Sequence, residues 1–440
     1  MQKLQELLLR SPAIVKQLTE EVSSGGLSLK EAERRVLEHL NHIGTLMISE
    51  VVEGVREPVG ENRVSVQGRL AVFDGVRNLS FLNRFGGTTT RGRRCYKFLE
   101  GGGGYYPLDE KLGMDQCGGF SPLMTYLQVL FGVGESFDRS AELLSEGVGF
   151  KVSATAVQNN TEATGARIDG HPLRMIPAAK RTEECELMLV EMDGTMSPQI
   201  HEEPTISGRE GLKQPTEYKE CNLVIIDKYR QSELIDRWMG ACYGPRDRFE
   251  QYAGHTGLQM GQLSAQQIVV LADGAKSNWE IQQTNFPDAV PILDFFHACE
   301  HLGEFGELYP EEKQGQKAFA RWKDMLWEGE ALQVIAEMKD CLARLRDTHK
   351  GQGHINYFQA NLSRMQYNEY RERGFPIGSG LVEGGCKFVI GKRFKASGMR
   401  WKKADNEAVL IARLAKLNGL LPDYFVPKPR EWSIPAAKAA

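Results

Sequence analysis

The spacing of hydrophobic residues changes several times along this chain, and each change predicts a different kind of structure. In the first sixty residues the apolar positions follow helical spacing and share one face. These positions are Ala32, Val36, Leu40, Ile43 and Met47. Ser28 and Glu31 precede them as a capping box, in which each side chain binds a free backbone amide at the helix start. We therefore predict N-terminal helices over residues 1–60, including a long amphipathic helix that needs a packing partner.

Alternating apolar and polar residues replace the helical spacing from Arg63 onward. Alternation is the pattern of a half-buried strand, because successive side chains point to opposite faces. Asp74-Gly75 is a dipeptide typical of two-residue hairpin turns. These features predict a small β module over residues 61–120.

Residues 121–170 contain a candidate helix-turn-helix. Phe137–Leu144 is the first predicted helix, Gly147-Val-Gly149 forms the turn, and Ser153 caps a second helix over Ala154–Thr164. A capping serine and a glycine-containing turn are expected of a DNA-reading motif. They are also common in ordinary helical connectors, so both interpretations stay open.

Strand-like apolar runs separated by longer polar or helical stretches begin after Arg181. The runs are Leu187–Met192, Asn222–Ile226, Ile268–Ala272 and Val290–Leu293. Pro291 restricts the last run to a strand start or a sheet edge, because proline has no N–H to donate to a neighbouring strand. This alternation predicts an α/β fold with a mixed sheet flanked by helices. Residues 311–370 instead predict an all-helical insertion, whose aromatic side chains form either a core or a base-stacking surface.

Composition narrows the classes of function. A length of 440 residues allows two or three domains, and a net charge of −4 means that any nucleic-acid site must be a local basic patch. The eight cysteines are widely spaced without a Cys-x-x-Cys pair, which predicts reduced, mostly buried thiols. The sequence has neither a signal-peptide core nor a membrane-length apolar stretch, so we expect a cytoplasmic protein with no membrane partner.

Two basic segments are candidates for such a patch. The first contains Arg91, Arg93 and Arg94, in either a phosphate-contacting or a simply solvated hairpin. The second runs from Lys387 to Lys403 without one acidic residue, which favours a surface that follows a DNA backbone. Its basic residues are Lys387, Lys392, Arg393, Lys395, Arg400, Lys402 and Lys403.

Three carboxylates suggest the chemistry. Asp193 and Asp273 each follow an apolar strand-like run and precede glycine, and Glu383 lies among glycines beside the second basic segment. Asp-Gly after a strand is individually a common turn. Taken together, however, two strand-ending aspartates and a distant glutamate are what a two-metal phosphodiester enzyme needs, since hard divalent cations bind clustered oxygen ligands.

His297 ends the short sequence Asp294-Phe-Phe-His297 and is either a core histidine or an active-site residue. His301 follows four residues later, but the only nearby carboxylates are Glu300 and Glu304, on different helix faces. This spacing predicts no zinc site here.

Five segments in this order resemble a known family. They are Glu-Met-Asp193-Gly, Leu-Ala-Asp273-Gly, Asp294-x-x-His297, Gly378-Ser-Gly-Leu-Val-Glu383-Gly-Gly and Gly398-Met-Arg-Trp401. Across residues 60–420 the chain resembles the bacterial insertion-sequence DDE transposases of the ISKra family. The Asp-x-x-His motif is also similar to one in Mutator-like and hAT transposases, which carry a helical insertion before the Glu.

The resemblance implies an RNase H-like catalytic core formed by residues 181–310 and 371–425. Its metal ligands would be Asp193, Asp273 and Glu383, with Mg²⁺ as the cofactor and Mn²⁺ able to substitute. His297 would act in the active site, and Trp401 would join the basic residues in binding DNA.

The implied substrates are terminal inverted repeats and target DNA, bound by a homo-oligomer in a synaptic complex near the bacterial nucleoid. Relatives often carry a zinc ribbon where this chain keeps only Cys95, so structural zinc is not expected in that module. Two other functions remain open: an RNase H-like nuclease without strand transfer, and a domesticated DNA-binding protein that has lost turnover.

Overall fold

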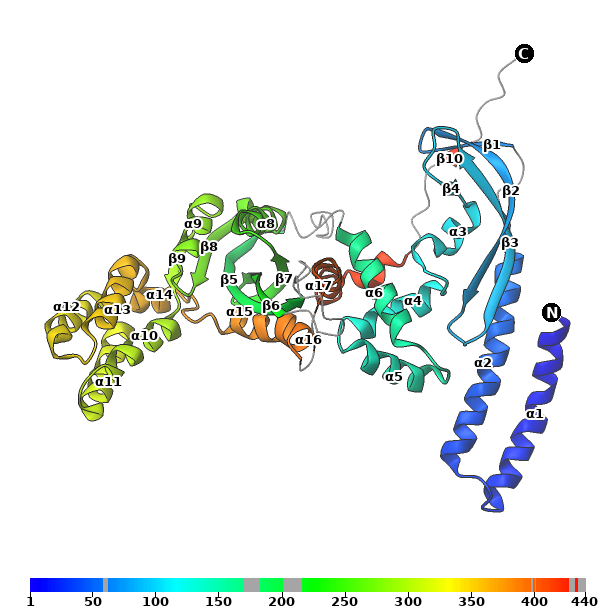
Figure 1. Cartoon of the computed structure of the whole chain (residues 1–440), viewed down its shortest axis with the longest axis horizontal. Coiled ribbons are helices and arrows are strands. Elements are labelled where there is room, and N and C mark those ends of the chain that lie inside the picture. The colour runs from blue at the N-terminus through cyan, green and yellow to red at the C-terminus, as the bar shows by residue number, and fades with distance from the viewer. Residues whose placement is uncertain are drawn as a thin grey trace, which may run out of the picture. The chain divides into compact units, whose positions relative to one another are not determined.

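The computed structural model describes residues 1–57, 62–169, 183–200, 216–396, 399, 401–426 and 432–433. The chain forms two compact units, one comprising residues 1–167 with 419–440 and the other residues 168–418 (Figure 1). The N-terminal helices, the β module and most of the candidate helix-turn-helix therefore lie within one unit.

The first unit begins with two long helices, α1 (Gln2–Ser23) and α2 (Leu29–Gly54), which pack against each other. The Ser28 hydroxyl accepts a hydrogen bond from the Glu31 amide at 3.2 Å, as the capping sequence predicted. Further along, α2 packs against the β module.

That module is a five-stranded antiparallel sheet with the order β10-β1-β2-β3-β4. Its strands are β1 (Arg63–Val66), β2 (Arg69–Leu82), β3 (Thr88–Phe98), β4 (Gly104–Tyr105) and β10 (Trp432–Ser433). The turn predicted at Asp74-Gly75 is wrong, because β2 continues through it with a bulge between Phe73 and Val76. Gly75 has a φ of 104°, a conformation that favours glycine at a bulge.

Short helices complete the first unit. They are α3 (Pro107–Leu112), α4 (Pro122–Gly132), α5 (Phe137–Val148), α6 (Ala154–Asp169) and α18 (Leu421–Tyr424). Helix α5 extends past the predicted end at Leu144 to Val148, and Gly149 caps it in the left-handed conformation. The turn of the candidate helix-turn-helix thus begins at Gly149. Whether this motif reads DNA stays a prediction.

The second unit is built on a mixed sheet with the order β7-β6-β5-β8-β9. Its strands are β5 (Cys185–Ile200), β6 (Thr216–Arg230), β7 (Glu233–Tyr243), β8 (Ala265–Ala272) and β9 (Val290–Leu293). Strands β5, β6 and β7 pair antiparallel, whereas β5, β8 and β9 pair in parallel. The predicted mixed α/β architecture is confirmed. Strand β9 is at the sheet edge, where Pro291 fits, but β7 was not predicted.

Helices cover both faces of this sheet. They include α8 (Arg246–Gln259), α9 (Lys276–Asn285), α15 (Gly380–Gly385), α16 (Lys392–Phe394) and α17 (Lys403–Leu417), with a π-helical turn over Cys386–Gly391 between α15 and α16. A Cβ on Gly240 would meet Tyr252 of α8, and one on Gly385 of α15 would meet Leu223 and Ile225. Gly240 pairs with Val224, which lies between those two residues on β6. Since side chains alternate along a strand, α8 and α15 lie on opposite faces.

A helical region lies between β9 and α15. It consists of α10 (Phe295–Glu307), α11 (Glu312–Trp327), α12 (Ala331–Cys341), α13 (Thr348–Asn361) and α14 (Tyr367–Glu372). The region begins before the predicted boundary at residue 311, because α10 follows β9 after a single residue, Asp294. Trp322 is buried and belongs to one hydrophobic core that also includes Ile292 and Leu293 of β9. The helices therefore share a core with the sheet.

All eight cysteines are free and six are buried, which confirms the predicted thiols. Within the described residues, no helix is both long and apolar enough to cross a membrane.

Candidate active site

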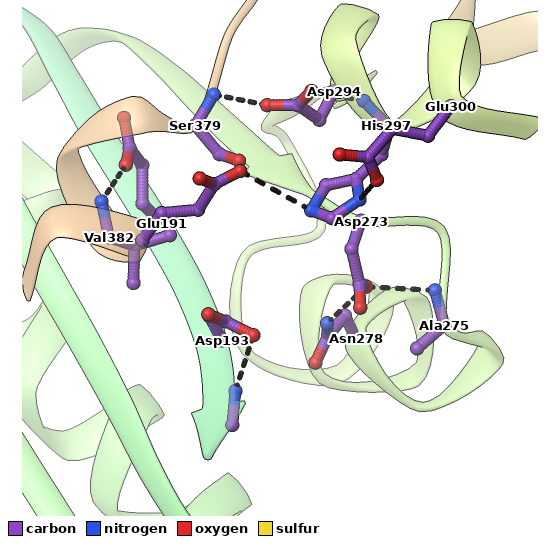
Figure 2. A network of polar contacts seen from close by, with 12 residues as sticks. Glu191, Asp193, Asp273, Ala275, Asn278, Asp294, His297, Glu300, Ser379 and Val382 are labelled. Atoms are coloured by element: carbon purple, nitrogen blue, oxygen red, sulfur yellow. Dashed lines mark hydrogen bonds and ion pairs between the residues drawn. The ribbon is translucent and has the colours of Figure 1, made fainter. Parts of the chain in front are cut away.

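The register of the sheet brings Asp193 and Asp273 together. Glu191 of β5 pairs with Leu271 of β8 in a parallel ladder. Two residues further along, Asp193 still belongs to β5 and Asp273 is the first residue after β8, close enough for its charge to act on the Asp193 carboxylate. In Figure 2 the two carboxylates point into a common space beside His297. Asp273 accepts hydrogen bonds at 3.0 Å from the Ala275 amide and from the Asn278 side chain.

Only one of these aspartates lies at a strand end. Strand β8 stops at Ala272, as predicted, but β5 continues through Asp193 because residues 194–200 pair with residues 216–222 of β6. The prediction that β5 ends at Asp193 is therefore wrong. Asp193 reaches the same space because β5 runs past the point where β8 stops.

The face of the sheet that carries Asp193 is the face covered by α15. Asp193 pairs with Leu223, and Glu191 pairs with Ile225, so these side chains share one face. Since Gly385 of α15 lies against Leu223 and Ile225, the helix that carries Glu383 covers that same face. The topology thus brings the distant glutamate to the two aspartates' side of the sheet.

Glu383 is linked to His297. One carboxylate oxygen of Glu383 lies 3.5 Å from His297 Nε2, and His297 Nδ1 lies 3.0 Å from Glu300. Both the Glu383 and the His297 side chains are partly exposed, at 38% and 30%. Solvent or substrate can therefore reach this pair. The four predicted catalytic residues all border one site.

Two buried carboxylates, Asp294 and Glu191, hold the backbone around this site. Asp294 was recognised only as part of the Asp-x-x-His motif, and Glu191 was not recognised at all. Asp294 accepts hydrogen bonds from the amides of His297, at 2.8 Å, and Ser379, while Glu191 accepts one from the Val382 amide at 2.8 Å. Together they hold the backbone on both sides of Gly380. A clue to Glu191 was its spacing of two residues before Asp193, which places both on one face of a strand.

Burial raises the pKa of two carboxyl groups in the site. It raises the pKa of Glu191 to about 8, because the charged carboxylate is costly in an apolar environment. Burial also raises the pKa of Asp193, with a smaller contribution in the same direction from the Asp273 charge. The Cys386 thiol, whose own pKa is raised by burial, hydrogen-bonds the Asp193 carboxylate. A cation between the aspartates would relieve their repulsion.

The donor set fits hard divalent cations. Asp193, Asp273 and Glu383 offer carboxylate oxygens, the ligands that Mg²⁺ and Mn²⁺ prefer. In the described part of the chain, these three oxygens do not form a group within 4.8 Å of one another. A single ion would therefore require these side chains to move closer together.

Three predicted DNA-binding lysines lie on the surface, and Lys395 contacts the strand that carries Asp193. Lys387, Lys392 and Lys395 are exposed. The Lys395 ammonium donates a hydrogen bond to the Thr195 hydroxyl, two residues beyond Asp193 on β5. A phosphate bound by Lys395 would lie close to the aspartates.

Two other residues of that predicted set are structural. Arg393 is only 1% exposed and its guanidinium lies 4.7 Å from the Trp401 ring centroid. Trp401 is also buried, donates a hydrogen bond to the Phe394 carbonyl at 3.3 Å, and accepts one through its carbonyl from Ile200. The structure thus does not place either side chain on a DNA-binding surface. Arg400 lies outside the described residues.

The arginines of the first basic segment are occupied by contacts within their own unit. Arg91 donates to the Val52 carbonyl, Arg93 forms an ion pair with Asp109, and Arg94 donates to the Tyr96 hydroxyl at 3.0 Å. Their guanidinium groups bind the protein itself, which disfavours the phosphate-contacting interpretation of this hairpin.

Comparisons with known proteins include a family match and remote structural likenesses. The chain is 11% identical to a chain of the Drosophila P element transposase strand transfer complex, covering 72% of this chain and 82% of that chain at a TM-score of 0.28. This score is too low to establish a shared fold. No curated protein matches the sequence. The family model matches residues 22–422, nearly the whole sequence. The chain therefore belongs to the uncharacterised protein family UPF0236.

Proposed function

We propose that this protein is a DDE transposase with an RNase H-like catalytic core. The observation that carries the proposal is the parallel pairing of β5 with β8, which brings Asp193 near Asp273, together with the packing of the Glu383 helix on the same face of the sheet. Carboxylates from two adjacent strands and one distant helix form the kind of ligand set that two-metal phosphodiester chemistry requires.

The architecture supports the RNase H-like assignment. A three-stranded antiparallel meander continues into two parallel strands, with helices on both faces. The helical region between β9 and α15 separates Glu383 from the aspartates in sequence. This arrangement agrees with the resemblance to DDE transposases that have a helical insertion before the Glu.

In this proposal, Asp193, Asp273 and Glu383 hold Mg²⁺, or Mn²⁺ in its place. Bound ions of this kind activate the attacking oxygen and stabilise the leaving oxygen of a phosphodiester. His297 orients the Glu383 carboxylate through their contact, and Asp294 and Glu191 fix the backbone that carries Glu383. Lys395, with Lys387 and Lys392, holds backbone phosphates beside Asp193.

The proposed substrates are the terminal inverted repeats of an insertion sequence and a target DNA. The enzyme would cut the element ends and join each freed 3′-OH to the target. A homo-oligomer would hold two ends together in a synaptic complex.

The test uses purified protein and a labelled duplex taken from the DNA that flanks the gene. With Mg²⁺ or Mn²⁺, the wild type should nick the duplex and join the 3′ end to a plasmid. Asp193→Asn, Asp273→Asn and Glu383→Gln should each abolish cleavage while DNA binding persists, because each removes a metal ligand and no phosphate contact. Asp288→Asn, which changes an exposed carboxylate of the same unit, is the matched control and should cleave normally.

Other outcomes identify the alternatives. Cleavage without joining would indicate an RNase H-like nuclease. Binding without cleavage by the wild type, in both metals, would indicate a silent DNA-binding protein. Near-normal cleavage by any one triad variant would remove that residue from the catalytic set.

A further inference from the structure

A second group of possible metal ligands lies in the helical region. His301 and Glu304 belong to α10, and His354 belongs to α13. Each offers one ligand atom, and these three atoms lie within 4.8 Å of one another. Among the described residues, no other three histidine, cysteine or acidic side chains come together this closely.

We propose that His301, Glu304 and His354 bind a zinc ion or a similar divalent transition metal. Two imidazoles and one carboxylate form a known three-ligand zinc set, whose fourth position is left to water or another ligand. The Glu304 side chain is 64% exposed and the His354 side chain 14% exposed, so the site opens to solvent on the glutamate side. Water can thus reach the fourth position.

The distances suit such an ion. His301 Nδ1 and His354 Nδ1 lie 3.0 Å apart, and His354 Nε2 lies 3.8 Å from a Glu304 oxygen. Ligand atoms at zinc distances of about 2.0–2.1 Å in a tetrahedron are separated by about 3.4 Å. These two separations involve different nitrogens of His354, of which only one can bind the ion. One ligand atom from each of the three residues lies within 4.8 Å of the other two, so side-chain rotations would close the site.

Packing fixes the orientation of the His301 ring, and burial favours the uncharged form of both imidazoles. The His301 ring stacks on Tyr357 of α13, with centroids 3.7 Å apart and planes at 20°. Burial lowers the pKa of both His301 and His354. Burial thus disfavours the charged imidazolium, the form that has no lone pair for an ion.

This site differs from the carboxylate site in the type of its ligands and in the role of its ion, which would be structural. Nitrogen ligands select transition metals, whereas the all-oxygen set of Asp193, Asp273 and Glu383 suits Mg²⁺. An ion here would join α10 to α13. Helix α10 is capped by Asp294 and carries His297. Tyr357 of α13 donates a hydrogen bond to the Asp273 carbonyl at 2.8 Å. The ion would thus stabilise the helical wall of the active site without contacting substrate.

A direct hydrogen bond between two neutral imidazoles would also explain the 3.0 Å contact, so the test must measure the metal. The full-length protein is dialysed against ZnCl₂, separated from free zinc, and analysed for zinc per chain. His301→Ala and His354→Ala remove ligands. Glu304→Gln is the variant that preserves folding, because its side chain is exposed. His349→Ala changes an exposed histidine elsewhere on α13 and is the matched control.

We expect about one tightly held zinc per chain in the wild type and in His349→Ala, and a large loss in His301→Ala and His354→Ala. Glu304→Gln should weaken zinc affinity at least about 10–100-fold, since even outer partners of metal ligands contribute that much. Zinc should raise the melting temperature of the wild type and of His349→Ala but not of the two alanine ligand variants. If Glu304→Gln bound as much zinc as the wild type and with the same affinity, the proposal would be overturned. Because no readout involves DNA cleavage, this result is independent of the proposed transposase activity.

Discussion

Glu191 couples the stability of the second unit to pH. Its side chain is buried, and burial raises its pKa from 4.5 to about 8. Between these two values the folded protein keeps the proton and the unfolded chain loses it. The free energy of unfolding therefore falls as pH rises through this window, by up to about 1.4 kcal/mol per pH unit, and levels off above pH 8.

Glu191→Gln should remove this pH dependence. Glutamine keeps a carbonyl oxygen that can accept the hydrogen bond from the Val382 amide, but it does not titrate. From pH 6 to pH 8 the titration of Glu191 costs the wild type about 2 kcal/mol of stability. For a unit of 150–250 residues this corresponds to a fall of about 4–8 °C in melting temperature. The variant should lack this fall and should be more stable than the wild type at pH 8.

Tryptophan fluorescence during thermal unfolding is a suitable assay, because five of the six tryptophans lie in the second unit. Measurements are made at several pH values without divalent cations, which would bind nearby carboxylates. Glu233→Gln, at an exposed position on β7, controls for the loss of a surface charge. If the pH profiles of Glu191→Gln and the wild type were parallel, Glu191 would not be the buried titrating group.

Three further variants separate charge, packing and chemistry. Changing Lys392 and Lys395 together to Ala should reduce the salt slope of DNA binding by about 2, at roughly 0.9 per phosphate contact. An unchanged slope in filter binding would mean that neither lysine contacts a DNA phosphate. Arg393→Ala should leave this slope unchanged. It should lower the free energy of unfolding by about 2 kcal/mol, because the buried contact of Arg393 with Trp401 is lost. A variant that unfolds in urea at the same concentration as the wild type would contradict this structural role. His297→Ala should slow cleavage about 10–100-fold with an unchanged melting temperature, and a wild-type rate would return His297 to a packing role.

The sequence alone determined where most helices and strands form. The capping pair at Ser28 and the helical spacing after it indicated α2, and the apolar run before Asp273 indicated β8. Such signals are local, because a helix cap or an alternating pattern depends on residues only a few positions apart. The order of Asp193, Asp273 and Glu383 along the chain was likewise enough to suggest a carboxylate site.

Tertiary structure decided which side chains reach that site. Whether β5 stops at Asp193 or continues depends on its pairing with β6, and Glu191 enters the site only because α15 folds onto its face. Arg393 is basic like its neighbours, yet the π-helical turn before it and the packing of Trp401 turn it inward. His354 meets His301 from 53 residues away. Contacts of this kind leave no local pattern, because strand register and helix packing are set by residues distant in sequence.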